Sequence, residues 1–198
     1  MRNWLLRNRP FFVFIPLLVT MGAWAVTHSA LGLGHLSILA FMGLGSWTFL
    51  EWLLHRAMHI DTGIAFIGRL QDSAHLRHHR EPDDLEHSVV RLRASIPITF
   101  LLLGVARLAF GHLDQALAVM CGLLTGYLFY EAVHLSAHTA HAAHPLPGLR
   151  SLRRMHLRHH FGQNDRAFGV TSPLWDWIFG TYRTRSGSQA TDLRPARP

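Results

Sequence analysis

Four apolar stretches constrain the fold of this chain more than any other feature of its sequence. They cover residues 11–31, 36–54, 95–110 and 114–133, of which the third is the shortest. About 20 apolar residues suffice for a helix to cross the hydrocarbon core of a bilayer, and a helix satisfies its own backbone hydrogen bonds there. The sequence therefore predicts an all-α integral membrane protein with four transmembrane helices.

The connections between these stretches predict how the helices are arranged. Residues 32–35 and 111–113 are very short connections, so the first two helices and the last two are expected to form hairpins. The first stretch also has features of a signal peptide. Its apolar run is longer than a usual signal core and a second span follows at once, so we favour a retained helix. We expect residues 1–184 to form one membrane-embedded domain and residues 185–198 a disordered tail.

The net charge of +7 comes from arginine, because the chain has no lysine. Arginines are concentrated in the N-terminus, in residues 56–93 and after residue 133, whereas the two short connections hold none. The positive-inside rule then predicts that both termini and the long middle segment face the cytoplasm. We interpret the arginines as contacts for anionic lipid headgroups and expect no nucleic acid, because they flank the apolar spans. These features predict a multi-pass protein of the cell inner membrane.

Ten of the 16 histidines fall into four clusters with two alternating spacings. An H-x-x-x-H pattern follows each pair of apolar stretches, and an H-x-x-H-H pattern follows each connector. Residues four apart share a helix face, so their imidazoles can reach one metal ion. Ten ligands exceed what one ion accepts, which predicts two ions with about five ligands each. The predicted ligands are His55, His59, His75, His78, His79, His134, His138, His156, His159 and His160.

Several nearby residues leave alternatives open. His141 and His144 follow the third cluster closely, and either can replace one of its ligands. Glu51 and Glu131 each precede an H-x-x-x-H pattern by about one helical turn. Each acid either accepts a hydrogen bond from the ring N–H of a ligand or lies at the membrane boundary, solvated or paired with arginine. Three more histidines lie near the opposite membrane face and are not expected to be ligands: His28, His35 and His112.

The position of the histidines favours redox chemistry over storage. Imidazole binds zinc, iron and copper alike, so the donor type alone does not select the metal. An all-histidine site at the membrane surface can receive a lipid chain from the bilayer, where iron can use O₂ to attack an unactivated C–H bond. Zinc has no redox chemistry to contribute. A non-catalytic membrane metal-binding protein remains the alternative, although no ionisable path crosses the spans.

The four clusters in this order resemble the fatty acid hydroxylase/sterol desaturase superfamily of integral-membrane di-iron enzymes. Residues 168–176, FGVTSPLWD, and residues 179–181, FGT, strengthen the likeness, which covers about residues 36–182. It implies a cap of cytosolic helices that holds two iron ions on the ten histidines, with no separate catalytic residue. Zinc can replace iron in the purified protein. The resemblance also implies O₂ as co-substrate and an external electron donor of the ferredoxin or cytochrome type.

The combined prediction is an O₂-dependent di-iron lipid hydroxylase, an oxidoreductase, acting on an acyl chain of a membrane lipid or fatty acid. His55 and His134 follow directly from predicted spans, so the metals should lie near the headgroups and oxidise a carbon near the head end, with 2-hydroxylation preferred. A lipid desaturase and a sterol or carotenoid hydroxylase are the alternatives. Four arginines next to the clusters hold either the substrate headgroup or bulk anionic lipid: Arg77, Arg80, Arg154 and Arg158.

The aromatic segment after the last cluster has two interpretations. Trp175, Trp177 and Phe179 can be anchors at the membrane interface. We prefer a role in which this segment seats its aromatic residues against the helix bundle and closes the metal site. Asn164 and Asp165, just before it, are expected to lie in a loop.

Overall fold

The computed structural model describes residues 2–82, 84, 88–139, 147–162 and 165–182, and within these ranges it contains helices and no strand. The long helices are α1 (Arg2–His28), α2 (Leu33–Met58), α6 (Leu92–Phe110) and α7 (Leu113–Ala137). The shorter elements are α3 (Ala65–Gln71), the π-helical turn η1 (Asp72–Leu76), α4 (Arg77–Arg80), α8 (Pro147–Phe161) and α9 (Leu174–Ile178). The all-α prediction is confirmed.

Four helical segments are long and apolar enough to cross a membrane: Asn8–His28, Leu33–Met58, Leu92–Phe110 and Leu113–Ala137. The predicted number of spans is therefore confirmed, while the helix ends differ from the apolar stretches. α1 ends at His28 because the Ser29 hydroxyl accepts a hydrogen bond from the amide of Leu31, at 3.0 Å, and so starts a turn. α2 and α7 continue as helices beyond residues 54 and 133.

α7 is the central helix of the bundle. α1, α2, α6 and α8 all pack against it, and it is mostly buried, whereas the other three long helices expose most of their surface. α2 approaches α7 most closely at two glycines. A Cβ atom on Gly43 would lie 2.0 Å from the carbonyl oxygen of Val119, and one on Gly122 would lie 1.8 Å from that of Ala40. Only glycine allows the two backbones to approach this closely.

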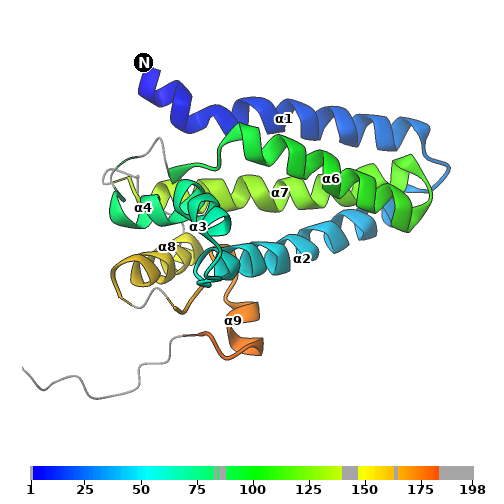
Figure 1. Cartoon of the computed structure of the whole chain (residues 1–198). Coiled ribbons are helices and arrows are strands. Elements are labelled where there is room, and N and C mark those ends of the chain that lie inside the picture. The colour runs from blue at the N-terminus through cyan, green and yellow to red at the C-terminus, as the bar shows by residue number, and fades with distance from the viewer. Residues whose placement is uncertain (1, 83, 85–87, 140–146, 163–164, 183–198) are drawn as a thin grey trace, which may run out of the picture.

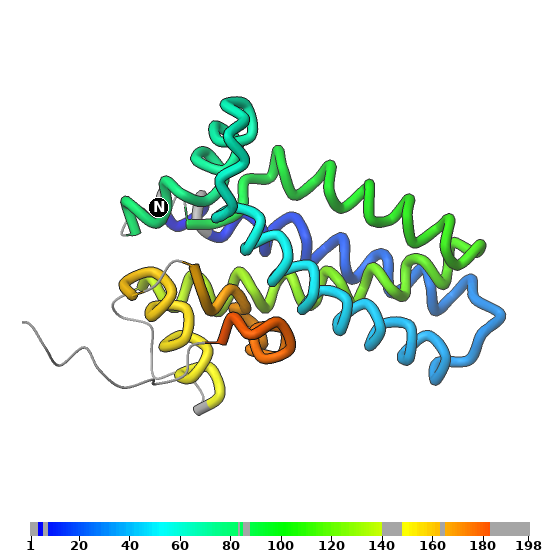
Figure 2. Tube along the Cα trace, turned by 60° about the horizontal axis from the view of Figure 1, so that its bottom comes forward, coloured from blue at the N-terminus to red at the C-terminus, as the bar shows by residue number. Residues whose placement is uncertain are grey.

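The two ends of the bundle differ in structure (Figure 1). The short turns between α1 and α2 and between α6 and α7 lie together at one end, as expected for two hairpins (Figure 2). At the other end α3, α4 and α8 gather around the last turns of α2 and α7, and α9 lies beside α2. All ten clustered histidines belong to this second end.

Candidate metal centre

The ten predicted ligands form two groups of five. Within each group the candidate ligand atoms all lie within 4.8 Å of one another. Site A consists of His55, His59, His75, His79 and His159. Site B consists of His78, His134, His138, His156 and His160. The expectation of about five imidazoles per metal ion agrees with this geometry.

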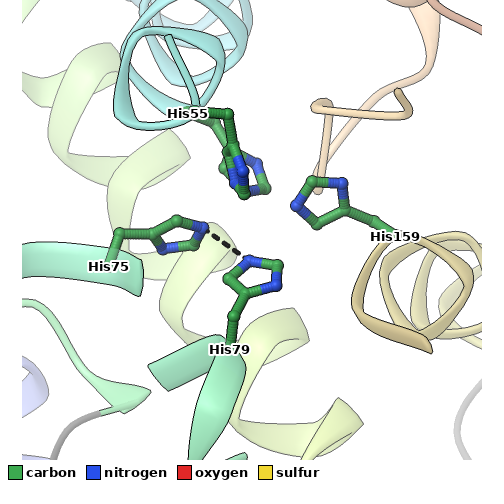
Figure 3. Close-up of side chains that lie close together, drawn as sticks. His55, His75, His79 and His159 are labelled. Atoms are coloured by element: carbon green, nitrogen blue, oxygen red, sulfur yellow. Dashed lines mark hydrogen bonds between the residues drawn. The ribbon is translucent and has the colours of Figure 1, made fainter. Parts of the chain in front are cut away.

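Site A joins three segments that are far apart in the sequence. His55 comes from the last turn of α2 and His59 directly follows that helix. His75 and His79 come from η1 and α4, and His159 comes from α8. Figure 3 shows the rings of His55, His75, His79 and His159 converging on one point, with 2.8 Å between the Nε2 atoms of His75 and His79.

Site B is built in the same way around the end of α7. Here His134 and its neighbour one turn later, His138, meet His156 and His160 of α8 and His78 of α4. The Nε2 atom of His78 lies 2.9 Å from that of His134 and 3.1 Å from that of His138. The Nε2 atoms of His138 and His156 are also 3.1 Å apart.

Each H-x-x-H-H cluster supplies both sites. His75 and His79 face site A while His78 faces site B, and on α8 His159 faces site A while the other two histidines face site B. Adjacent helical residues point about 100° apart because a turn takes 3.6 residues. A cluster that ends in two consecutive histidines therefore reaches two centres. The π-helical turn η1 lies at the start of the first such cluster, and π-turns inside helices are frequent at functional sites.

The donor atoms fit a metal ion. Nitrogen ligands about 2.0–2.1 Å from a shared ion lie about 3 Å from one another, which matches the separations of 2.8–3.1 Å seen here. Four buried Nε2 atoms have no hydrogen-bond partner among the described residues: those of His55, His59, His159 and His160. A buried polar atom without a partner is costly, and coordination to a metal removes that cost.

Burial also keeps these rings in the state that binds metals. Desolvation, followed by repulsion from His159, lowers the pKa of His59 to about 4. The same two causes, with further histidines, lower the pKa of His79 to about 2. Burial likewise lowers the pKa of His75 and His156 well below its ordinary value. The rings are therefore neutral at physiological pH, as metal ligation requires.

Backbone carbonyls orient two of the site A rings. The Nδ1 atom of His55 lies 2.6 Å from the carbonyl oxygen of Phe168, and that of His159 lies 2.7 Å from the carbonyl oxygen of Arg166. A carbonyl can only accept, so each Nδ1 must carry the proton, which leaves the Nε2 lone pair for a metal. The sequence did not predict this role for residues 166–168.

Glu51 does not orient a histidine, so that expectation is wrong. Its carboxylate instead accepts hydrogen bonds from the backbone of the segment after α8. The amide of Thr171 donates to it at 2.8 Å, the hydroxyl of Thr171 at 2.5 Å, and the amide of Val170 also donates. Trp47 donates from its indole at 3.1 Å. Glu51 is fully surrounded by protein, and so it is not an acid exposed at the membrane boundary either.

Glu131 is buried in the same way at the equivalent place on α7. One of its oxygens accepts a hydrogen bond from the amide of Val90 at 3.0 Å. It therefore holds the chain that leads into α6 rather than a ligand ring. In both halves of the molecule, the acid before the H-x-x-x-H pattern binds backbone amides of a connecting segment.

Asp176 is a functional residue that the sequence analysis missed. It is completely buried, and its carboxylate accepts hydrogen bonds from the amides of Phe168 and Gly169 at 3.0 and 2.8 Å. The indole of Trp52 and the hydroxyl of Thr181 donate to it at 3.2 and 2.6 Å. With Glu51 it fixes the loop whose carbonyl orients His55. A single acid within an aromatic run was the only sign of this role in the sequence.

The aromatic segment seats on α2 as preferred. The ring of Phe179 stacks on Trp52 with centroids 4.5 Å apart, and that of Trp175 lies 4.8 Å from Phe49. The ring of Phe168 lies beside that of His55, with centroids 5.8 Å apart, and closes one side of site A. Trp177 is exposed, so the interpretation as an anchor at the membrane interface also keeps support.

The remaining candidates fall outside the two sites. His28, His35 and His112 lie at the opposite end of the bundle, as expected. Asp165 is exposed, and Asn164, His141, His144 and the expected tail, residues 185–198, lie outside the described residues.

The four arginines divide into two pairs. Arg77 and Arg80 bind acids of the cap, Glu81 at 3.2 Å and Asp72 at 2.7 Å. Arg154 and Arg158 line a surface cavity of about 380 Å³. The second pair borders this cavity and is therefore placed to meet an external anionic group.

Comparison with known proteins agrees with this geometry. A dihydroceramide fatty acyl 2-hydroxylase of Arabidopsis thaliana is 32% identical over 176 residues, which cover 87% of this chain and 71% of the relative. The ceramide very long chain fatty acid hydroxylase of Saccharomyces cerevisiae is 35% identical over 71% of this chain, and human fatty acid 2-hydroxylase is 30% identical over 72%. The matched parts are 37% and 39% of those two longer relatives.

A solved structure shares the fold. The structure of full-length scs7p, in which only the hydroxylase domain is visible, superposes with a TM-score of 0.81 at 26% identity, covering 95% of this chain and 69% of that one. A model of the family described as fatty acid hydroxylase matches residues 39–181, which include both histidine sites and the loop that orients site A. The predicted multi-pass membrane oxidoreductase of the hydroxylase type is thereby confirmed, and the chain belongs to the fatty acid hydroxylase family.

Proposed function

We propose that this protein hydroxylates an acyl chain of a membrane lipid or fatty acid, using O₂ and two iron ions held by sites A and B. The observation that carries the proposal is the convergence of ten imidazoles, in two groups of five, at the end of a membrane bundle. The net reaction converts R–H, O₂, two electrons and two protons into R–OH and water. Iron bound at these sites would supply the redox chemistry with O₂, for which zinc is unsuited.

The contribution of the chain itself is placement. His55 and His134 belong to the last turns of α2 and α7, so both sites lie where the spans end. An acyl chain that rises between the spans presents its head-end carbons there. Holding one C–H bond next to the oxidant supplies the orientation component of catalysis. We therefore propose oxidation near the acyl linkage, with position 2 preferred, as the names of the relatives describe for those proteins.

Electrons must come from outside this domain. We propose a separate donor of the ferredoxin or cytochrome type on the cytoplasmic side of the cell inner membrane. The orientation is supported by the arginines, which accompany the histidine end of the bundle and are missing from the two short turns. Reporter fusions at Gly34 and His112 should then be external, whereas an internal result would reverse the orientation.

Mass spectrometry of cellular lipids tests the function. Cells that express the gene under ¹⁸O₂ should contain 2-hydroxyacyl lipids with one labelled oxygen, and cells that lack it should not. The loss of two hydrogens without added oxygen would indicate a desaturase. A labelled isoprenoid with unchanged acyl lipids would overturn the acyl-chain assignment in favour of a sterol or carotenoid hydroxylase.

A further inference from the structure

An apolar groove runs along the bundle between α2 and α6, over the surface of α7. It consists of two adjoining cavities of about 100 and 590 Å³. Leu102 of α6 and Leu123 of α7 line both cavities and so form the neck between them. Because all three helices are membrane spans, the groove faces the hydrocarbon of the bilayer.

The smaller cavity lies next to the metal centre. Its lining includes Leu54, which directly precedes the ligand His55, and Val90, whose amide binds Glu131. Three hydroxyl residues also line it: Ser95, Thr99 and Tyr127. Thr99 donates to the carbonyl oxygen of Ser95 at 2.8 Å and Ser95 to that of Arg91 at 3.5 Å, so two of the three hydroxyls are turned to the helix backbone. The other lining residues are apolar except for the indole N–H of Trp47, which binds Glu51, and so most of the wall suits hydrocarbon.

The larger cavity continues away from the metals towards the far end of α6. Ala109 and Phe110, the last residues of that helix, line its end. From Ser95 to Phe110 the groove follows about 22 Å of helix, at 1.5 Å per residue. This length suits a long acyl chain that lies parallel to the spans with its methyl end at Phe110.

Small side chains keep the larger cavity open. Gly45 lines it, and a Cβ atom built on Gly45 meets no heavy atom of the described residues within 4 Å. Gly43 lies two residues earlier, on the opposite side of α2, and differs because its Cβ atom would overlap the backbone of α7. Gly43 thus serves helix packing, whereas Gly45 borders empty space. Close packing against α7 therefore does not explain the glycine at position 45. Its missing side chain instead leaves space in the groove for a ligand.

We propose that this groove holds the acyl chain of the substrate and that Gly45 and Ala109 set the longest chain accepted. The proposal rests on the proposed function, since it assigns the chain-binding part of the same site. Gly45 lies ten residues before His55, which is about 15 Å along α2, whereas Ala109 lies at the far end of the groove. A bulky side chain at Gly45 should therefore shorten the accepted chain more than one at Ala109.

The test compares two glycines that both have free space. Gly45→Leu fills the groove, whereas Gly104→Leu adds the same side chain to α6 outside the two cavities. A leucine side chain that overlaps the bound acyl chain should disfavour chains that reach past it by about 5- to 150-fold, the cost of overpacking a well-filled space. Gly45→Leu should thus lower the ratio of long-chain to short-chain hydroxylated products by about tenfold or more. Ala109→Phe should remove only the longest products, and Gly104→Leu should match the wild type. Equal profiles for Gly45→Leu and Gly104→Leu would overturn the proposal.

A second measurement does not depend on turnover. A fatty acid with a diazirine at its methyl end, added to the purified protein in phosphatidylcholine vesicles, should label residues 105–110 after illumination. Gly45→Leu should reduce this labelling, and Gly104→Leu should not. Labelling spread evenly over the outer faces of the spans would refute the groove. Groove labelling without hydroxylated product in cells would instead keep the groove and reject the proposed reaction.

Discussion

Sites A and B contain the same number of histidines from the same two sequence patterns, yet they differ in what holds their rings. In site A, carbonyls of residues 166–168 fix His55 and His159. In site B, the Nδ1 atoms of three rings, those of His134, His156 and His160, have no hydrogen-bond partner among the described residues, and the same holds for His79 in site A. One site B ring, that of His78, has its Nδ1 atom 3.0 Å from the hydroxyl of Ser88. The repeated motif therefore supplies the candidate ligands but does not determine which groups orient their rings.

The two sites also touch. The ring of His79 in site A stacks on that of His160 in site B, with centroids 3.9 Å apart and planes only 5° from parallel. A displacement in either ring is therefore passed directly to the other site. The comparison predicts that removal of one ligand weakens metal binding at both sites. Removal of a group that orients a ring should instead weaken metal binding only at the site to which that ring belongs.

Removal of a ligand should have the largest effect. His79→Ala and His160→Ala should each lower bound metal and reduce turnover by more than about 100-fold, since even the loss of a group that orients a ligand costs about 10- to 100-fold. Because the two rings stack, each variant should also lower metal affinity at the other site. Metal analysis and product formation measure both effects. His112→Ala, at the opposite end, should change neither, and full activity of His160→Ala would remove that residue from the site.

Loss of the loop support should come next and should affect site A. Asp176→Asn turns an amide towards the backbone N–H groups of Phe168 and Gly169, so the loop can no longer present its carbonyl to His55. Metal affinity and turnover should fall by about 10- to 100-fold. In a His79→Ala background, Asp176→Asn should not weaken the ion that remains at site B. A further loss there would show that the loop supports both sites equally.

The contrast between ligands and support explains what the sequence could predict. The spacing within each cluster places its histidines near one another through local helix geometry alone, so all ten candidate ligands could be named from the sequence. The assignment of His78 to the site opposite His75 requires the packing of α4 against α7 and α8. Neither alternative considered for Glu51 was right, because its partners, Val170 and Thr171, are about 120 residues away in the sequence.

The helix ends follow the same logic. Hydropathy predicted four spans, but α2 and α7 continue beyond their apolar stretches, through residues such as His55 and His134. These side chains are polar but buried in the structure, because each faces the other histidines of its own site rather than lipid. Hydropathy measures preference for lipid, and so it underestimates helices that end in a buried polar centre.

A steric change in the loop should have an intermediate effect. A Cβ atom on Gly169 would lie 2.1 Å from the carbonyl oxygen of Ser172, so Gly169→Ala must displace the loop next to His55. Overpacking of this kind costs about 1–3 kcal/mol, and a decrease of about tenfold in site A affinity is expected. Gly148→Ala in α8 is the matched control, because its Cβ meets no described atom within 4 Å. Equal metal titrations of the two variants would contradict the role of the loop.

The smallest predicted effect tests a side-chain support of site B, the Ser88 hydroxyl beside His78. The Ser88 hydroxyl donates to the carbonyl of Asp84 at 3.1 Å, and so it is free to accept the Nδ1 proton of His78. Ser88→Ala removes one hydrogen bond with a net value of about 1 kcal/mol, which corresponds to about fivefold weaker metal binding. The exposed Ser73→Ala is the control, and metal titration monitors both variants. Since His78 belongs to site B, Ser88→Ala should still weaken the ion that remains in the His79→Ala variant, where Asp176→Asn should not. If the two substitutions act on the same ion, the two sites do not have separate supports.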